Sequence, residues 1–337
     1  MKNTIHTLIY KNDYDNLKKV LNKKNIYERD YNKEMAIHIA CRLGNEKLID
    51  LMFKIDNNIL NAVNQYGDNC FFILIDFPKL LIKYLKLTNF KSINYVDNTG
   101  LSLLKYYLIK IQKYDINFLK LLYNNKANIN SPNNSSKLFL VLSKQKNSYE
   151  KFKIIFDIFK NININFFDKS GKKPIFYIVM TNNLPLIKLF IENGADPNST
   201  VKDNDYSLFE VVLHYCSYEI IKYFLSLNLD CSYLNNDNNT FLNIAFNLLF
   251  ENNQNKKYSR TITKDIIKKL IQMCDLNIQN IVGVNSLHYL LKSNTWHLFK
   301  DELSKKKLNL KLKNKNGKTA LDYLKNKKDF LKIVKHK

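Results

Sequence analysis

The sequence predicts an all-α solenoid of about ten helix-turn-helix repeats with short β-hairpin loops. Asn or Asp recurs at intervals close to 33 residues, and five of the seven glycines stand three residues after one of these anchors. Between the anchors, apolar residues recur at three- and four-residue spacing. Self-similarity at this period indicates a repeat architecture, which builds a continuous surface rather than a deep catalytic pocket. The anchors are Asp30, Asn64, Asp97, Asn133, Asp168, Asp203, Asn235, Asn280 and Asn314.

The anchors divide the chain into repeats of one solenoid domain that covers residues 1–337. The expected repeats are 1–29, 30–63, 64–96, 97–132, 133–167, 168–202, 203–234, 235–279, 280–313 and 314–337. The first and the last are expected to be caps, because terminal repeats must present a polar outer face. Repeat 235–279 contains a polar, Lys-rich insertion at 251–264.

Each anchor is expected to form a hairpin turn. Asn and Asp tolerate left-handed backbone angles and bond their own main chain, and the following Gly suits the same turn. Another Asn stands three residues before several anchors, at Asn61, Asn94, Asn130, Asn165 and Asn277.

The helices are predicted from apolar periodicity in segments such as 47–55, 78–87, 116–123, 219–227 and 265–273. This spacing buries one stripe of each helix against the adjacent repeats. The 21 Tyr and 21 Phe are interpreted mainly as core residues and contacts between repeats, with a minority exposed as interaction hot spots.

Three phrases point to a known family. Residues 168–198 end in Gly-Ala-Asp-x-Asn at 194–198, residues 35–53 carry His38, Ala40 and Gly44 in a His-x-Ala-Ala-x-x-Gly spacing, and NSLHYL at 285–290 repeats the opening phrase. The chain resembles ankyrin-repeat proteins from its N-terminus to about residue 330. Its composition and divergent repeats are similar to those of ankyrin proteins from large DNA viruses or from an AT-rich intracellular parasite. The C-terminus does not resemble the F-box-like segment of poxvirus relatives.

The family's motif histidine is present at His38 and His288. The resemblance implies a structural role for both rings, each hydrogen-bonded to the neighbouring hairpin. Elsewhere the position holds another residue, namely Phe72, Lys105, Phe139, Phe176, Glu210, Asn243 or Asp322.

A formal net charge of +23 leaves three interpretations open. The lysines form a solvated face partly imposed by AT-rich codons, or they attract an acidic protein partner, or they bind nucleic acid. Only three Arg are present, although Arg is the preferred residue for bidentate phosphate contacts. Lysines concentrate at 300–318, 325–337 and in the 251–264 insertion.

No motif for chemistry was found, so we predict no catalytic residue, no metal site and no cofactor. The glycines are never closer than 23 residues, which excludes a phosphate-binding loop. Ser-His-Asp or Cys-His combinations have no local signature. An enzyme with a site in the insertion is the third-ranked class. The pair Trp296–His297 is either an exposed hot spot or, as the favoured alternative, an aromatic contact between helices.

The chain is expected to be intracellular and monomeric. Its expected location is the cytoplasm, which includes the cytoplasm of a host cell. The N-terminus lacks the apolar core of a signal peptide, and the strongest apolar run, residues 70–75, is far too short to span a membrane. The five cysteines show no metal-ligand spacing and are expected to be reduced thiols.

The resemblance implies that a protein partner binds the concave surface formed by hairpin tips and first-helix ends. The expected tip residues are Gln65, Tyr66, Asn98, Thr99, Lys169, Ser170, Asn204, Asp205, Asn236, Asp237, Ile281, Val282 and Lys315. The expected first-helix residues are Arg42, Leu43, Met180, Thr181, His214 and Lys292. Tyr66, Ile281 and Val282 are apolar residues at exposed tips, unless they fold back onto the next repeat.

The predicted function is a non-enzymatic scaffold for protein–protein interaction, such as a viral host-interaction protein. The alternative is polyanion or nucleic-acid binding through the Lys-rich C-terminal third.

Overall fold

A computed structural model describes residues 5–130, 135–202, 206–250 and 262–334. These residues are mostly helical, which confirms the predicted all-α fold class. The chain divides into two compact parts, an N-terminal block of residues 1–162 and a C-terminal block of residues 163–337. The predicted repeat boundaries stay a prediction.

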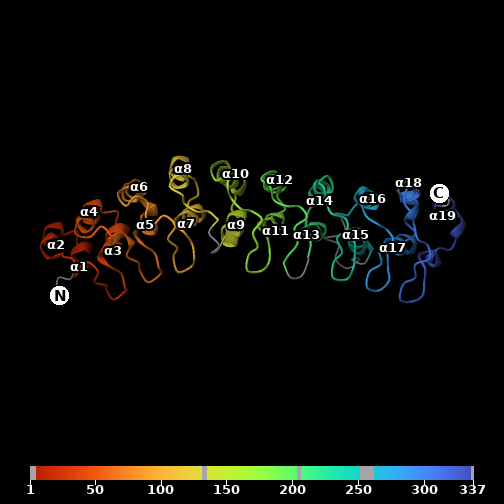
Figure 1. Cartoon of the computed structure of the whole chain (residues 1–337), viewed down its shortest axis with the longest axis horizontal. Helices are drawn as coiled ribbons and strands as arrows, with labels where there is room; N and C mark the ends of the chain where they lie inside the picture. Colours follow the sequence, from red (N-terminus) through yellow and green to blue (C-terminus); the bar gives the residue numbers. More distant parts are fainter. Residues whose placement is uncertain (1–4, 131–134, 203–205, 251–261, 335–337) are drawn as a thin grey trace. The chain divides into compact units, whose positions relative to one another are not determined.

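In the N-terminal block, paired helices follow one another along the chain (Figure 1). The first helices of the pairs are α1 (Ile5–Tyr10), α3 (Ala36–Arg42), α5 (Cys70–Ile73), α7 (Leu103–Lys110) and α9 (Ser135–Ser143). The second helices are α2 (Tyr14–Val20), α4 (Glu46–Ile55), α6 (Pro78–Leu87), α8 (Ile116–Asn124) and α10 (Ser148–Ile158). Short 3₁₀ helices η1 (Ile59–Asn61) and η2 (Leu74–Asp76) complete the block.

The C-terminal block repeats the same arrangement. Its first helices are α11 (Pro174–Val179), α13 (Leu208–Tyr215), α15 (Phe241–Phe250), α17 (Ser286–Lys292) and the 3₁₀ helix η4 (Ala320–Tyr323). The second helices are α12 (Leu184–Glu192), α14 (Tyr218–Leu225), α16 (Lys264–Met273), η3 (Trp296–Phe299) with α18 (Lys300–Ser304), and α19 (Lys327–Val334). In each block the hairpin loops lie on the side away from the second helices (Figure 1).

The helices form where the sequence caps them and buries one side. In α4, the Asn45 side chain accepts a hydrogen bond from the Leu48 N–H at 3.2 Å, which satisfies one of the free donors of the first turn. Leu48, Ile49 and Met52 of α4 are buried, as its apolar spacing predicts. The amphipathic interpretation of the periodic segments is therefore confirmed for this helix.

The hairpins are closed by isolated antiparallel bridges, for example between Val63 and Asn69 and between Lys313 and Thr319. Each anchor side chain accepts main-chain N–H bonds from the residues two and four positions later; for Asn64 these come from Tyr66 at 2.8 Å and Asp68 at 3.0 Å. The same pair of bonds occurs at Asp30, Asp97, Asp168, Asn235, Asn280 and Asn314. The predicted turn role of these anchors is confirmed, while Asn133 and Asp203 lie outside the described residues.

Three residues after each anchor that the structure describes, the backbone is left-handed. Gly67 has a φ of +81°, and two repeats that lack the glycine keep the conformation, with φ of +60° at Lys33 and +56° at Asn238. An L-residue is strained at such angles, Asn less so than Lys. The left-handed turn conformation is therefore kept in the two repeats that have Lys33 or Asn238 in place of glycine.

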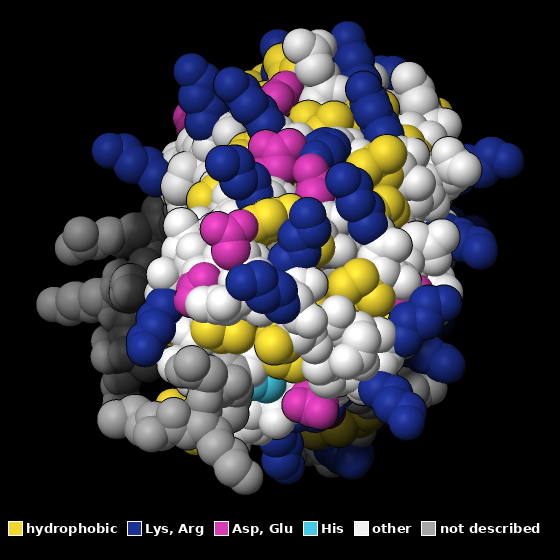
Figure 2. Space-filling model, turned by 90° about the vertical axis from the view of Figure 1, so that its left-hand side faces the viewer, with side chains coloured by type: hydrophobic (Ala, Val, Ile, Leu, Met, Phe, Trp, Pro, Cys, Tyr) yellow, Lys and Arg dark blue, Asp and Glu magenta, His cyan; other side chains and the backbone are white. Residues whose placement is uncertain are grey.

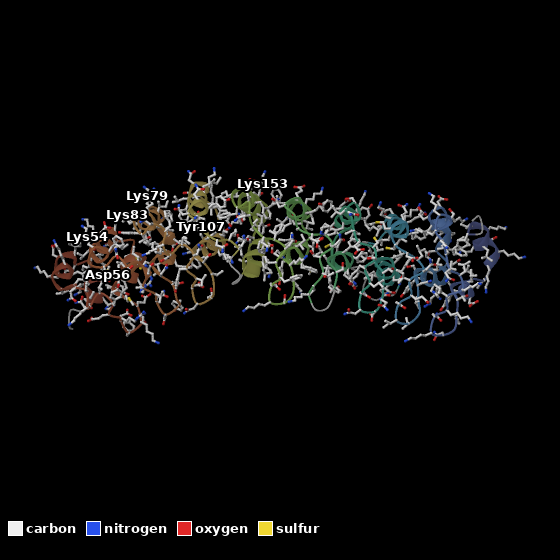
Figure 3. All side chains as sticks on the ribbon, in the orientation of Figure 1. Lys54, Asp56, Lys79, Lys83, Tyr107 and Lys153 are labelled. Atoms are coloured by element: carbon white, nitrogen blue, oxygen red, sulfur yellow. The ribbon has the colours of Figure 1, made fainter. Side chains whose placement is uncertain are left out.

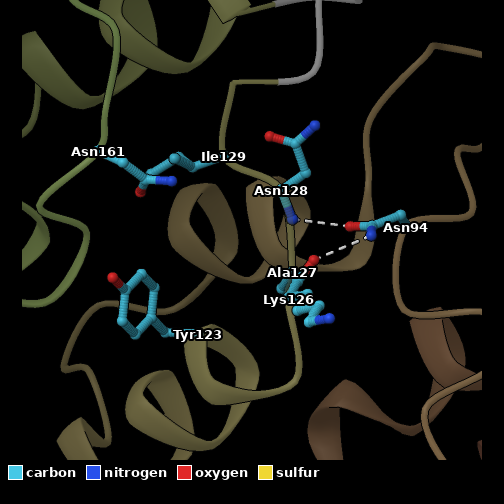
Figure 4. A pocket seen from close by; sticks show the side chains of 7 residues that line it. All are labelled: Asn94, Tyr123, Lys126, Ala127, Asn128, Ile129 and Asn161. Atoms are coloured by element: carbon cyan, nitrogen blue, oxygen red, sulfur yellow. Dashed lines mark hydrogen bonds between the residues drawn. The ribbon is translucent and has the colours of Figure 1, made fainter.

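The asparagines that precede the anchors join neighbouring repeats. In the N-terminal block, Asn94 accepts a bond from the Asn128 N–H at 2.7 Å and donates one to the Lys126 carbonyl at 3.0 Å (Figure 4). In the C-terminal block, Asn165, Asn198 and Asn277 make the equivalent pairs of bonds. The nitrogen and the oxygen of each side-chain amide thus both bond to the next repeat and fix its register.

Candidate protein-interaction surface

The predicted binding residues lie at hairpin tips and at the ends of first helices. Asn204 and Asp205 fall outside the described residues. Thr181 and His214 are half-buried. The remaining predicted residues are exposed: Arg42, Leu43, Gln65, Tyr66, Asn98, Thr99, Lys169, Ser170, Met180, Asn236, Asp237, Ile281, Val282, Lys292 and Lys315.

Backbone hydrogen bonds connect adjacent hairpins within each block. In the N-terminal block, the Asn98 N–H donates to the Tyr66 carbonyl at 3.3 Å. In the C-terminal block, the Ile281 N–H donates to the Asp237 carbonyl at 2.9 Å, and the Lys315 N–H to the Val282 carbonyl at 3.1 Å. These bonds fix the backbone from which the tip side chains project.

The three apolar tip residues project outward. The exposed fractions are 62 % for Tyr66, 51 % for Ile281 and 44 % for Val282. Their side chains therefore do not fold back onto the next repeat, which was the alternative left open by the sequence. Contiguous exposed apolar side chains mark contact sites, and Ile281 and Val282 are neighbours on one hairpin.

The two motif histidines are structural. The His38 ring accepts a bond from the Met35 N–H at 3.1 Å and donates one to the Ala62 carbonyl at 2.9 Å. His288 bonds in the same way to the Asn285 N–H at 3.3 Å and the Lys318 carbonyl at 3.2 Å. Burial lowers the pKa of both rings, so that each stays neutral near pH 7. The role that the family resemblance implied is confirmed.

Other residues at the motif-histidine position also reach the following repeat. Glu210 accepts bonds from the Tyr233 hydroxyl at 2.9 Å and the Asn235 amide at 3.2 Å, and Asn243 accepts one from the Ser286 hydroxyl. Lys105 is fully buried, and burial lowers its pKa to about 8. The position keeps its linking role where the side-chain chemistry has changed.

Trp296 is 8 % exposed and packs edge-to-face against Phe330, with ring centroids 5.4 Å apart. Its indole N–H is buried and has no hydrogen-bond partner within the described residues. The predicted aromatic contact between helices is therefore confirmed, and the alternative of an exposed Trp–His hot spot is wrong.

Two pockets lie in the N-terminal block. One of about 240 Å³ lies between the ends of α3, η2 and α7, and is lined by Arg42, Asp68, Phe72, Ile73, Asp76, Phe77, Tyr106 and Lys110. The other, of about 460 Å³, lies at the asparagine contacts described above and is lined by Asn94, Tyr123, Lys126, Ala127, Asn128, Ile129 and Asn161 (Figure 4). Neither pocket places a nucleophilic side chain next to a general base. Within the described residues, no group of three or more His, Cys, Asp or Glu side chains could hold a metal ion.

Sequence reasoning missed several residues of the tip surface in the N-terminal block. Tyr31 is 93 % exposed at the tip of the first hairpin, and Asp76 and Lys110 form an ion pair of 2.7 Å at first-helix ends. A step of 34 residues connects Arg42 to Asp76 and Asp76 to Lys110, and the same step connects Tyr31 to Gln65. Extending the repeat spacing to every repeat would have found all three.

Charged side chains also cover surfaces away from the tips. Lys54, Lys79 and Lys153 project from the second helices, while Lys83 pairs with Asp50 at 2.7 Å (Figure 3). At the end where α1 and α2 lie, lysines and carboxylates alternate with small apolar areas (Figure 2). This mixture is typical of a solvated surface.

Comparison with known proteins gives a family match for one part of the chain. Residues 175–225 match the family model described as ankyrin repeats in many copies. Over these residues the chain is similar to ankyrin repeats. No helix in the described part of the chain is long and apolar enough to cross a membrane.

Two curated ankyrin-repeat proteins are similar to the chain. An ankyrin repeat protein of Acanthamoeba polyphaga mimivirus is 25% identical over 322 residues, which are 86% of this chain and 40% of the relative. An ankyrin repeat protein of Rickettsia felis is 32% identical over 78 residues, covering 23% of this chain and 26% of the relative. The chain thus spans well under half the length of each.

Among solved structures, the crystal structure of an ankyrin repeat protein is similar at 22% identity with a TM-score of 0.41. The match covers 58% of this chain and 94% of that one.

Proposed function

We propose that this protein is a non-enzymatic scaffold that binds a protein partner through its hairpin tips and first-helix ends. Ankyrin repeats generally mediate protein–protein interaction. One observation carries the proposal for this chain: bonds between adjacent hairpins fix the backbone from which exposed apolar side chains project. A preformed surface loses little conformational entropy on binding.

The proposed location is the cytoplasm, which includes the cytoplasm of a host cell. The protein is proposed to act there as a monomer. The similarity to a protein of a virus supports the host setting by analogy. All five cysteines are free thiols, which suits a reducing compartment.

Affinity capture with the whole chain tests the proposal. We expect the substitutions Leu43→Ala, Tyr66→Ala and Ile281→Ala together to remove a partner that the unchanged protein captures. The matched control is Leu87→Ala with Ile116→Ala, because both residues are exposed apolar side chains on or at the start of second helices. Equal capture by the tip variant and the control would rule out the tip surface.

A second function, polyanion binding through the C-terminal third, is favoured by charge. Residues 264–334 hold sixteen lysines against six carboxylates. If phosphates are the ligand, affinity for a DNA duplex must fall steeply with salt, because each neutralised phosphate releases counterions. Salt-independent or undetectable duplex binding excludes this function.

A further inference from the structure

The last two hairpins of the C-terminal block combine apolar tips with lysines. Ile281 and Val282 are exposed on one hairpin, and Lys313, Lys315 and Lys318 are exposed on the next. Exposed Lys292 ends α17 on the same repeat as the apolar pair. We call these six residues the basic tip patch: Ile281, Val282, Lys292, Lys313, Lys315 and Lys318.

Backbone contacts hold the two hairpins together. The Lys315 N–H donates to the Val282 carbonyl at 3.1 Å, and the Gln279 amide donates to both the Gly283 carbonyl at 2.6 Å and the Lys313 carbonyl at 2.9 Å. His288 adds its bond of 3.2 Å to the Lys318 carbonyl. The lysines therefore flank the apolar pair on a common framework rather than on independent loops.

Lysines outnumber carboxylates at this patch, with Asp237 at the tip of the preceding hairpin. No Asp or Glu occurs between Asp275 and Asp301 or between Glu302 and Asp322. Within the described residues, Lys292, Lys313 and Lys315 form no ion pair, whereas Lys268 and Lys327 elsewhere in the block do. Lys318 lies over the Tyr323 ring at 5.8 Å. Four ammonium groups thus face solvent or an aromatic ring on the hairpin and helix end next to the apolar pair.

Codon bias does not account for the patch, because the equivalent hairpins of the N-terminal block differ. Those hairpins contain Asp30, Glu34, Asp68 and Asp97 and fewer lysines. A bias acting on the whole chain would raise the lysine content of both sets of tips. The difference is local, and it lies on the surface that the proposed function uses.

We propose that the basic tip patch binds an acidic, amphipathic segment of a protein partner, with apolar side chains on Ile281 and Val282 and carboxylates opposite the lysines. The inference rests on the proposed function and specifies its partner. An apolar centre with a charged rim is the usual anatomy of a protein interface. A nucleic-acid backbone would gain from the lysines but not from the two exposed aliphatic side chains, which favours a peptide.

Three labelled peptides of about 15 residues test the chemistry against the whole chain by fluorescence anisotropy. The first contains Glu and Asp with Leu and Phe, the second has Ser in place of its apolar residues, and the third has Lys in place of its acids. We expect the first to bind at least about tenfold more tightly than either of the others. Equal binding of the first two would show that charge alone acts, and tight binding of a DNA duplex alone would assign the patch to polyanions; both results overturn the proposal.

Two pairs of substitutions locate the site. Lys313→Gln with Lys315→Gln, and separately Ile281→Ser with Val282→Ser, should each weaken the first peptide by about tenfold. The matched control is Lys264→Gln with Lys269→Gln, which removes the same charge from exposed lysines of α16. A thermal melt of each variant confirms that it is folded. Equal weakening by the control overturns the placement.

The outcome is separable from that of the scaffold proposal. If the tip variants Leu43→Ala and Tyr66→Ala abolish partner capture while the peptides bind without regard to the patch, the scaffold stands and this inference fails. If neither set of substitutions affects any binding, both fail.

Discussion

Lys33 and Asn238 occupy a backbone conformation that glycine occupies in other repeats. Their φ values of +60° and +56° lie in the left-handed region, where a side chain costs about 1 kcal/mol and Asn is better tolerated than Lys. The bonds that the anchors Asp30 and Asn235 make to the same turns hold these residues there.

Replacing Lys33 with Gly should therefore stabilise the protein by about 0.5 kcal/mol, since relief of strain exceeds the extra chain entropy of glycine. Asn238→Gly should give a smaller gain. Gly67→Ala should destabilise strongly, because a Cβ there would lie 2.6 Å from the Asn98 backbone nitrogen. Urea denaturation measures all three, and a loss of stability in Lys33→Gly would contradict the strain argument.

His38 makes stability depend on pH. Burial lowers its folded pKa below the unfolded value of 6.5, so the unfolded chain binds more protons as pH falls. The stabilisation by the neutral ring is present above pH 6.5 and is lost as pH drops through that value toward the folded pKa.

We expect the urea midpoint to decrease between pH 7.5 and 5.5. His38→Phe, which copies Phe72 at the equivalent position, should lower stability at pH 7.5 but flatten this dependence. The control is His297→Phe, which makes the same substitution at an exposed histidine outside the motif position. An unchanged slope in His38→Phe would show that other groups cause it.

At the residue scale, the sequence predicted what depends on local contacts. The anchors could be found because each side chain bonds its own main chain within four residues. The partners of Glu210 could not, because Tyr233 and Asn235 come within reach only after neighbouring repeats pack. Exposure of Tyr66 likewise followed from packing and was left as one of two alternatives.

At the scale of elements, the helix pairs followed from periodicity but their lengths did not. The apolar run at 70–75 is divided into α5 and η2, and Pro78 begins α6 immediately afterwards. The segment around Trp296 forms a 3₁₀ helix before the short α18. Periodicity does not distinguish these tighter turns from an α-helix, because i+3 contacts occur in both.

The asparagine contacts between repeats are expected to contribute to stability. Asn94→Ala removes two bonds across the junction of repeats and should cost about 1–2 kcal/mol. Asn236→Ala, at an exposed tip, is the control and should change stability by less than about 0.5 kcal/mol. Denaturant midpoints compare the two, and equal losses would mean that the Asn94 bonds contribute nothing.

At the scale of the whole molecule, the sequence predicted a solenoid without placing the partner surface completely. The repeat spacing located most hairpin tips, and the same spacing places Tyr31 at a tip and Asp76 and Lys110 at first-helix ends, although none of the three was among the predicted residues. The difference in charge between the two sets of tips can be recognised only when the repeats are aligned and the exposure of each side chain is known.

The net charge of +23 should make the folded protein more stable in salt. Like charges repel in the compact state, and added ions screen the repulsion. We expect the thermal midpoint to rise by at least about 2 °C between low and moderately high NaCl. Lys264→Glu with Lys269→Glu, which lowers the net charge, should reduce the increase. A midpoint that falls with salt would show that attractive ion pairs dominate instead.

The side chains at the motif-histidine position make neighbouring repeats specific to one another. His38 offers a proton to the Ala62 carbonyl, whereas Glu210 offers lone pairs to a hydroxyl and an amide. Exchanging the two would set a buried carboxylate against a carbonyl oxygen, with no donor between them. The repeats are therefore not interchangeable. A gene duplication or deletion that joined these two junctions would leave a donor or an acceptor without its partner.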